Sequence, residues 1–230
     1  MEKPTTAFVL GAGLGTRLRP LTDSTPKPML EVRGRPLIER IFDSLASAGI
    51  SRIIVNTHHA AWRYAERFAS GTHAGAELEF VHEPELLDTG GGLKNVLDRI
   101  DFESGAAVYN GDIFSGIDMR AFLDSFASGP DDASLVLRRD GPCRNVSVRG
   151  GRVCDIRFLL GAQYDAAMQF SGIFAARGEF LKFVEEFPRS RFSTVEAISG
   201  YIARGGSVGM WEDSSFWSDI GTPEEYERLK

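Results

Sequence analysis

Between residues 6 and 139, short apolar segments alternate with amphipathic ones, and this alternation limits the folds that the chain can adopt. Residues 6–10 (TAFVL) and 52–56 (RIIVN) are typical of buried strands, and residues 36–49 between them place their apolar side chains on one helical face. Strands that alternate with helices favour an α/β fold around a parallel, doubly wound sheet. Further strands are expected at residues 77–82, 106–110 and 133–139, and further helices at residues 60–69 and after Gly92.

After residue 139 the pattern becomes α+β. A hairpin is expected to turn at Gly150–Gly151, and a terminal helix is expected to begin at Thr222 and Pro223. A strand at residues 168–176 and helices at residues 180–187 and 194–205 are expected between them. Because no Pro/Ser-rich linker, repeat or low-complexity tract separates the two parts, residues 1–230 are expected to form a single domain with a cleft.

The charge balance and the cysteine count exclude several classes of protein. Lys and Arg number 26 and Asp and Glu number 32, so the net charge of −6 argues against a nucleic-acid partner bound by a broad basic surface. Two cysteines, Cys143 and Cys154, are too few for a disulfide framework and fit a reduced, cytoplasmic compartment. No apolar run reaches the length of a signal-peptide core or a membrane span, so no membrane contact is expected.

Residues 11–30 (GAGLGTRLRPLTDSTPKPML) follow the first expected strand and combine glycines with cations. The G-x-G-x-x-G dinucleotide fingerprint does not fit them, and the chain contains no Gly-Lys pair for a G-x-x-x-x-G-K-[ST] loop. Glycines at positions 11, 13 and 15 permit positive φ and a close approach of backbone N–H groups to phosphate oxygens, and Arg17 adds a forked donor. The segment therefore favours polyphosphate binding, although GAGLGTR alone is equally consistent with a surface turn.

Lys27 lies between Pro26 and Pro28. Proline fixes its own φ and restricts the residue before it, so we expect an extended segment that aims the ammonium group in one direction. A lysine held in this way suits a reacting phosphate.

The complete string, G-[AG]-G-x-G-T-R-L-x-P-L-T followed by P-K-P-M-L, resembles the triphosphate-binding signature of the sugar-1-phosphate nucleotidyltransferases. The resemblance extends from Ala7 to about Tyr226. It implies a Rossmann-like, mostly parallel sheet of the nucleotide-diphospho-sugar transferase type with an α+β sugar-binding part, and a catalytic domain without a further extension. It also implies that Arg17 meets the leaving phosphates, that Lys27 meets the α-phosphate, and that the loop residues wrap the triphosphate. These loop residues are Gly11, Ala12, Gly13, Gly15 and Thr16.

Two aspartates follow strand-like segments and match the family's metal-binding motifs. Asp112 stands in NGD after Asn110, which we include among the nucleotide contacts, and Asp219 stands in W-x-D-I-G-T-P. Magnesium takes one or two protein carboxylates together with substrate phosphates, so Mg²⁺ is the expected cofactor. Either aspartate alone would also suit a turn or a helix cap.

Two further motifs bear on the base and the sugar. Thr89, Gly90 and Gly91 lie in LLDTGGG, which is most similar to the N-acetylmuramate-1-phosphate uridylyltransferases, and the resemblance implies contact with the base and a preference for UTP. Ser171 and Gly172, in FSGIF, resemble a sugar-binding segment of the same branch. The family's Glu-Lys-Pro motif is missing, and Arg157 is a candidate substitute for its lysine.

Three alternatives stay open at this point. They are a mannose- or heptose-1-phosphate guanylyltransferase, a phosphocholine-type cytidylyltransferase, and a non-catalytic nucleotide-sensing module. In the favoured case the partners are a nucleoside triphosphate and a sugar 1-phosphate, and the alternatives also bind small molecules. A monomer or small homo-oligomer is expected.

The adjacent His58 and His59 would point to opposite sides of an extended segment, so a shared zinc ion is not expected. Glu83 and Glu85 flank Pro84, and solvated loop carboxylates are the expected reading of this pair.

Overall fold

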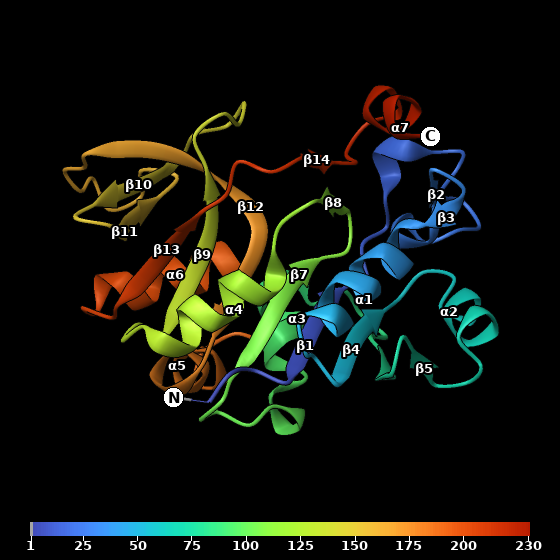
Figure 1. The fold of residues 1–230 in the computed structure, drawn as a ribbon, viewed down its shortest axis with the longest axis horizontal. Coiled ribbons are helices and arrows are strands. Elements are labelled where there is room, and N and C mark those ends of the chain that lie inside the picture. Colours follow the sequence, from blue (N-terminus) through green and yellow to red (C-terminus); the bar gives the residue numbers. More distant parts are fainter. Residues whose placement is uncertain (1) are drawn as a thin grey trace. The chain divides into compact units, whose positions relative to one another are not determined.

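The computed structural model describes residues 2–230, and its contacts divide them into two compact units built from discontinuous segments (Figure 1). The glycine-loop unit comprises Thr5–Leu86, Tyr109–Ala121 and Ser215–Lys230. The hairpin unit comprises residues 2–4, Leu87–Val108 and Phe122–Ser214. The strand β7 (Ala106–Asn110) and the helix α4 (Met119–Ser128) contribute residues to both units.

The glycine-loop unit has a sheet in the order β1-β4-β6-β5, in which β1, β4 and β6 run parallel and β5 is antiparallel. Ala7, Phe8 and Val9 of β1 are fully buried, as are Ile53, Ile54 and Val55 of β4, so these apolar runs form the core. The strands of this unit are β1 (Thr6–Leu10), β2 (Glu31–Val32), β3 (Arg35–Pro36), β4 (Arg52–Thr57), β5 (Thr72–His73), β6 (Ala76–His82), β8 (Ile113–Ser115) and β14 (Trp217–Asp219).

The helices of this unit follow the expected order along the chain. They are α1 (Leu37–Ser47), α2 (Trp62–Arg67) and α7 (Pro223–Leu229), with 3-10 turns η1 (Thr16–Leu18) and η2 (Lys27–Met29). The helix expected at residues 60–69 is shorter than predicted. The cap expected at Thr222 is confirmed, because its side chain accepts a hydrogen bond from the Glu225 N–H group.

The hairpin unit contains the antiparallel part of the fold. The strands β9 and β13 pair in parallel, and β12 pairs antiparallel with β9 and with β10. The predicted hairpin is confirmed, since β10 and β11 flank Gly150 and Gly151, which both have positive φ. Its elements are α3 (Asp88–Lys94), η3 (Leu97–Arg99), β9 (Ala133–Arg138), β10 (Val146–Arg149), β11 (Arg152–Ile156), β12 (Ala166–Ala176), α5 (Gly178–Glu185), α6 (Thr194–Ala203) and β13 (Val208–Glu212).

The helix α3 begins before the three glycines that were expected to precede it. The N–H groups of Gly90 and Gly91 both donate to the Phe192 carbonyl, at 2.9 and 3.0 Å, which satisfies the first turn of the helix. A Cβ atom on Gly91 would lie 2.1 Å from the Ser190 carbonyl oxygen. The glycines therefore allow the segment before α6 to approach the helix, and this packing outweighs their low helix propensity.

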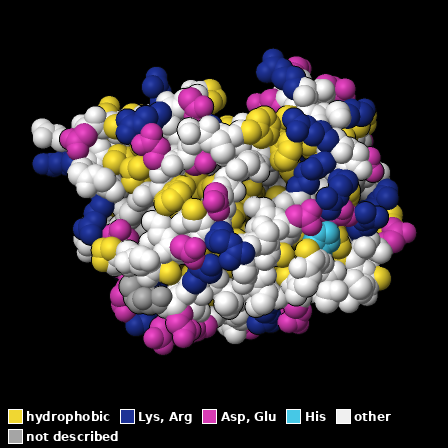
Figure 2. Space-filling model, in the orientation of Figure 1, with side chains coloured by type: hydrophobic (Ala, Val, Ile, Leu, Met, Phe, Trp, Pro, Cys, Tyr) yellow, Lys and Arg dark blue, Asp and Glu magenta, His cyan; other side chains and the backbone are white. Residues whose placement is uncertain are grey.

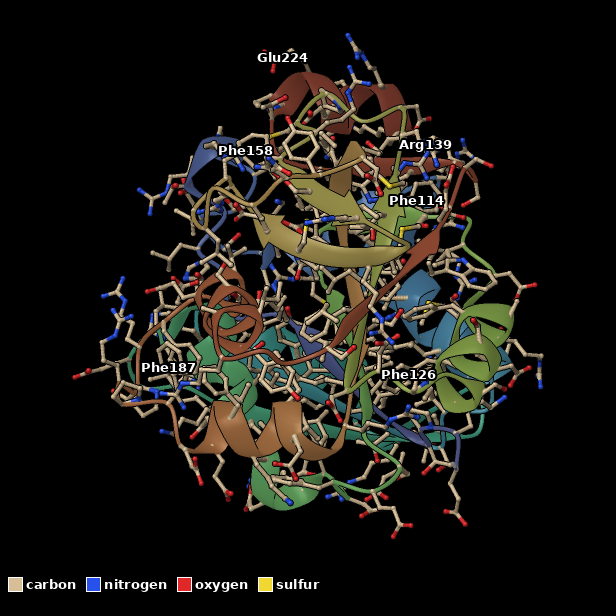
Figure 3. All side chains as sticks on the ribbon, turned by 90° about the vertical axis from the view of Figure 1, so that its left-hand side faces the viewer. Phe114, Phe126, Arg139, Phe158, Phe187 and Glu224 are labelled. Atoms are coloured by element: carbon tan, nitrogen blue, oxygen red, sulfur yellow. The ribbon has the colours of Figure 1, made fainter. Side chains whose placement is uncertain are left out.

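Aromatic side chains close the core of the hairpin unit. Phe187, which follows α5 and is labelled in Figure 3, stacks on Phe192 with ring centroids 3.9 Å apart. The Arg177 guanidinium lies over the ring of Phe126 and donates to the carbonyls of Phe126 and Gly129. Burial lowers the pKa of Arg177, and these acceptors compensate for its buried charge.

The α/β class with a mostly parallel central sheet is confirmed. On the face drawn in Figure 2, acidic and basic side chains are intermixed. Within residues 2–230, no helix combines the length and the apolar character that a membrane crossing requires.

Candidate active site

The glycine-loop segment leaves the end of β1 through a tightly held Gly11. Its N–H group donates to Asn56 Oδ1 at 2.7 Å, and its carbonyl accepts from the Tyr64 hydroxyl at 3.2 Å. A Cβ atom on Gly11 would lie 2.7 Å from the Asn56 carbonyl oxygen. Only glycine fits this approach between the loop and β4, so the course of the following residues is fixed from its first peptide.

Asn56 links the loop to a buried carboxylate. Its Nδ2 group donates to Glu83 Oε1 at 2.8 Å, and only 1% of Glu83 is exposed. The expectation that Glu83 is a solvated loop carboxylate is therefore wrong. A buried carboxylate needs a donor, and Asn56 supplies one while its Oδ1 holds the loop.

The loop encloses one side of a cavity of about 370 Å³. Of the three loop glycines, Gly15 has a positive φ of 59°, and its carbonyl accepts from the Thr22 hydroxyl at 2.8 Å. Gly13 has open space around it, and Thr16 begins η1. The cavity is lined by Gly13, Leu14, Gly15, Thr16, Arg17, Leu18, Lys27, Leu86, Asp112 and Gly221. The loop residue Ala12 is buried.

Lys27 lies in the wall of this cavity, with 10% of its side chain exposed. Its Nζ atom lies 2.6 Å from Asp112 Oδ2 and 3.7 Å from Asp219 Oδ1. The expected extended segment is wrong, because Lys27 starts the turn η2, in which the Met29 N–H group donates to the Pro26 carbonyl. Pro26 itself keeps the extended conformation and the turn directs the lysine.

A two-stranded sheet explains why two aspartates far apart in sequence reach the same lysine. The strands β8 and β14 pair antiparallel, with Asp219 opposite Ile113, and the Ile220 N–H group donates to the Asp112 carbonyl at 3.0 Å. The Gly111 N–H group donates to the Leu10 carbonyl, which ties this sheet to the end of β1.

Aromatic and cationic side chains brace the β8–β14 pair. The rings of Phe114, labelled in Figure 3, and Phe216 meet edge to face with centroids 5.1 Å apart. The Arg33 guanidinium lies 5.5 Å and 5.9 Å from these two ring centroids. Such contacts stabilise the register that aligns the aspartates.

The surroundings of Asp219 disfavour its ionised form. Burial, and then the neighbouring Asp112 carboxylate, raise the pKa of Asp219, while Lys27 and Arg17 act in the opposite direction. Its Oδ1 atom is buried and accepts no hydrogen bond, although 45% of the side chain is exposed. Two adjacent carboxylates, one with an orphaned oxygen, are hard donors of the kind that magnesium prefers, so these residues fit a magnesium site.

The described residues 2–230 contain no cluster of three or more metal-ligating His, Cys, Asp or Glu side chains. Magnesium commonly binds one or two protein carboxylates and completes its coordination with phosphate oxygens or water.

Arg17 lies on the same wall. A Cβ atom on Gly221 would come within 3.1 Å of its guanidinium, so this glycine leaves room for it. Arg17 forms no ion pair or hydrogen bond with another described residue, and its donors are free for a ligand in the cavity. Asn110 is the last residue of β7, two positions before Asp112.

The predicted base and sugar contacts lie in the hairpin unit. Thr89 Oγ1 accepts a hydrogen bond from the Thr194 N–H group at 2.8 Å, and the N–H groups of Gly90 and Gly91 donate to the Phe192 carbonyl. Ser171 and Gly172 lie where the pairing of β12 with β9 shifts register, and Gly172 has a φ of 83°. Ser171 is buried, and its Oγ atom accepts from the Ile173 N–H group.

Sequence reasoning missed Asn56 and Tyr64, which hold the loop. Asn56 lies near the end of the buried strand β4, and a polar side chain at that position is the signal that could have found it. His58 and His59 hydrogen-bond to different carbonyls, those of Glu83 and Thr22.

The family model described as nucleotidyl transferase matches residues 6–143. The chain belongs to this family, and the predicted membership of the sugar-1-phosphate nucleotidyltransferases is confirmed.

Two curated relatives carry different names. A mannose-1-phosphate guanylyltransferase of Mycobacterium tuberculosis is 34% identical over 96% of this chain, which spans 62% of that protein. An N-acetylmuramate alpha-1-phosphate uridylyltransferase of Neisseria meningitidis is 29% identical over 94% of this chain and 93% of its own length.

Solved structures give the same fold. HddC from Yersinia pseudotuberculosis aligns with a TM-score of 0.77 at 26% identity and covers 97% of both chains, and another structure of it is complexed with GMP-PN. The inositol-1-phosphate CTP transferase from T. maritima aligns with a TM-score of 0.80 at 18% identity, over 99% of this chain and 96% of its own.

Proposed function

We propose that this chain transfers a nucleotidyl group from a nucleoside triphosphate to a sugar 1-phosphate and releases pyrophosphate. The observation that carries the proposal is the contact of Lys27 with both Asp112 and Asp219 in the wall of the glycine-loop cavity. Two carboxylates, an aimed lysine and the Arg17 guanidinium converge beside a loop held by its backbone. This set of groups suits a reaction that gathers several phosphate charges.

In the proposed reaction, an oxygen of the sugar 1-phosphate attacks the α-phosphorus of the triphosphate. The new phosphorus–oxygen bond forms as the bond from the α-phosphorus to the bridging oxygen breaks, and pyrophosphate leaves with that electron pair. The attacking oxygen is already anionic near neutral pH, so no general base is required. Lys27 and Arg17 align the phosphates and offset their charge, and no covalent enzyme intermediate is needed.

Asp112 and Asp219 are the proposed ligands of a magnesium ion. When bound, such an ion neutralises phosphate charge and polarises phosphoryl oxygens. The buried, unpartnered Asp219 Oδ1 atom and the adjacent Asp112 carboxylate support this assignment.

For the substrates we favour UTP and N-acetylmuramate 1-phosphate. The LLDTGGG and FSGIF motifs and the similarity to the Neisseria uridylyltransferase support this choice. The second candidate is a mannose- or heptose-1-phosphate guanylyltransferase. The 34% identity to the Mycobacterium protein favours it, as do a heptose 1-phosphate guanylyltransferase of Aneurinibacillus thermoaerophilus at 26% identity and the GMP-PN complex of HddC. We expect the protein to act in the cytoplasm in NDP-sugar synthesis for the cell wall, as a monomer or small homo-oligomer.

A matrix of the four nucleoside triphosphates against a panel of sugar 1-phosphates, with pyrophosphate release as the readout, tests both levels of the proposal. Turnover with UTP and N-acetylmuramate 1-phosphate at least about tenfold above other pairs supports the favoured substrates, since a single missing hydrogen bond to the base or the sugar costs about that factor or more. Preference for GTP supports the second candidate. Absence of pyrophosphate release with every pair, with and without magnesium, contradicts the proposed reaction.

A further inference from the structure

The position of Lys27 has a consequence for the binding of a divalent cation. Its ammonium group contacts Asp112 Oδ2 at 2.6 Å and lies 3.7 Å from Asp219 Oδ1. One monovalent cation thus faces both carboxylates that are the proposed magnesium ligands and offsets part of their combined charge. The inference below rests on the proposed function for the identity of that site.

The two contacts differ in quality. The distance to Asp112 is that of a short, charge-assisted hydrogen bond, whereas 3.7 Å to Asp219 is too long for a hydrogen bond. Asp219 Oδ1 is accordingly buried without a donor. The ammonium group offsets the charge of this oxygen but leaves its lone pairs without a partner. A metal ion coordinated by this oxygen would accept a lone pair as well as offset the charge.

The turn and the burial of the side chain limit the positions that the Lys27 ammonium group can take. The turn that carries Lys27 is closed by hydrogen bonds from the Met29 N–H group to the Pro26 carbonyl and from the Leu30 N–H group to the Lys27 carbonyl. The side chain is 90% buried but also lines the cavity. Its head group therefore has two accessible partners, the aspartates and an anion in the cavity.

We propose that Lys27 competes with the divalent cation for Asp112 and Asp219. Like charges cannot share the same oxygens at contact distance without a large repulsion, and Arg17, which also acts on Asp219, adds to it. The free protein then binds the cation weakly, and the cation binds strongly only when the ammonium turns toward a phosphate in the cavity. Cation and phosphate binding are coupled through one side chain, and the coupling is reciprocal.

Binding of Mn²⁺ to the protein without nucleotide tests this proposal, with free Mn²⁺ measured by electron paramagnetic resonance. Lys27→Met removes the charge and keeps the length of the side chain, and we expect it to tighten Mn²⁺ binding at least about tenfold, because the competing charge is gone. Lys27→Arg keeps the charge and should stay within about threefold of the wild type. The control Lys182→Met, which removes an exposed lysine paired with Glu179, should leave the affinity unchanged.

A second substitution locates the site. Adding Asp219→Asn to Lys27→Met should abolish the gain in Mn²⁺ affinity, because the cation loses one of its two carboxylates. An affinity of Lys27→Met equal to or weaker than that of the wild type overturns the proposal, as does an equal gain in Lys182→Met.

Lysine acetylation of the wild type, followed by mass spectrometry, decides the question without a variant and therefore covers a failure of Lys27→Met to fold. Displacement by Mg²⁺ should raise the labelling rate of Lys27 at least about threefold at concentrations that occupy the site, while Lys182 stays constant. Unchanged or slower labelling of Lys27 overturns the competition. Neither experiment contains nucleotide, so its outcome is independent of the pyrophosphate-release matrix, and the two proposals can fail separately.

Discussion

Exchanging the amide of Asn56 with the carboxylate of Glu83 tests how the glycine loop is held. In the native arrangement the Gly11 N–H group donates to Asn56 Oδ1, and Asn56 Nδ2 donates to Glu83 Oε1. Asn56→Asp keeps the acceptor for Gly11 but places a second carboxylate against Glu83. Both residues are buried, with 2% and 1% of their surface exposed, so water does little to relieve the repulsion.

The cost of Asn56→Asp follows from these burials. An uncompensated buried charge costs about 3 kcal/mol or more, a large share of the roughly 5–15 kcal/mol by which folded domains are stable. Glu83→Gln alone retains an acceptor for the Asn56 amide and should cost about 1 kcal/mol, the difference between a charged and a neutral hydrogen bond. In the double variant, the amide introduced at position 83 donates to the carboxylate introduced at position 56, which restores the pattern with the two groups exchanged.

Urea denaturation of the wild type, both single variants and the double variant gives the coupling energy. We expect the double variant to be about 2 kcal/mol more stable than the sum of the single effects predicts, and the cycle cancels what each substitution changes elsewhere. The KM for the nucleoside triphosphate should rise in Asn56→Asp and return toward the wild-type value in the double variant. A coupling energy below about 0.5 kcal/mol, the usual level of additivity, refutes this account of the loop.

Three further predictions concern the aspartates, Lys27 and a helix cap. Asp112→Ala, Asp219→Ala and Lys27→Ala should each lower pyrophosphate release at least about a hundredfold with an unchanged circular dichroism spectrum, because each removes a group that offsets phosphate charge; rates within about tenfold of the wild type contradict these roles. Asp219→Asn should raise the Tm at pH 7.5, because the pKa of Asp219 is raised in the folded state. Ionisation of this carboxyl group therefore lowers the free energy of unfolding as pH rises from the unfolded pKa through the folded one. The difference should vanish at pH 3, below the unfolded pKa of about 3.9, and a lower Tm of Asp219→Asn at pH 7.5 argues against this electrostatic reading. Ser193→Ala should cost about 1 kcal/mol in urea denaturation, because the Ser193 side chain accepts from the Glu196 N–H group in the capping box of α6. The hydrogen bond from the Ser193 N–H group, and then the one from Arg189, lower the pKa of Glu196. The stability that the Glu196 carboxylate contributes to the fold is therefore present above its unfolded pKa and is lost as pH falls through the folded pKa.

Local rules were sufficient where the sequence carries its own geometric signal. The alternation of apolar strands and amphipathic helices predicted the strands β1, β4 and β6 and their parallel direction, and paired glycines predicted the β10–β11 hairpin. Thr222 with Pro223 predicted the start of α7. Each of these features depends on interactions within a few residues or on the burial of one face, so the sequence alone defines it.

Local rules failed where distant segments decide the conformation. Three consecutive glycines disfavour a helix, yet Phe192 caps the first turn of α3 and its neighbours pack where side chains would clash. Glu83 is a polar residue beside a proline, yet it is buried and paired with Asn56.

The sequence by itself determined the order of strands and helices, the glycine loop and the family resemblance, because these are written in composition and short-range spacing. Tertiary structure alone decided that Lys27 contacts Asp112 and Asp219, since that meeting depends on the pairing of β8 with β14, two strands separated by about half the chain. It also decided that the Asn56 side-chain oxygen faces the loop and that its NH₂ group faces Glu83. Such contacts follow from long-range pairing and burial, for which neighbouring residues carry no signal.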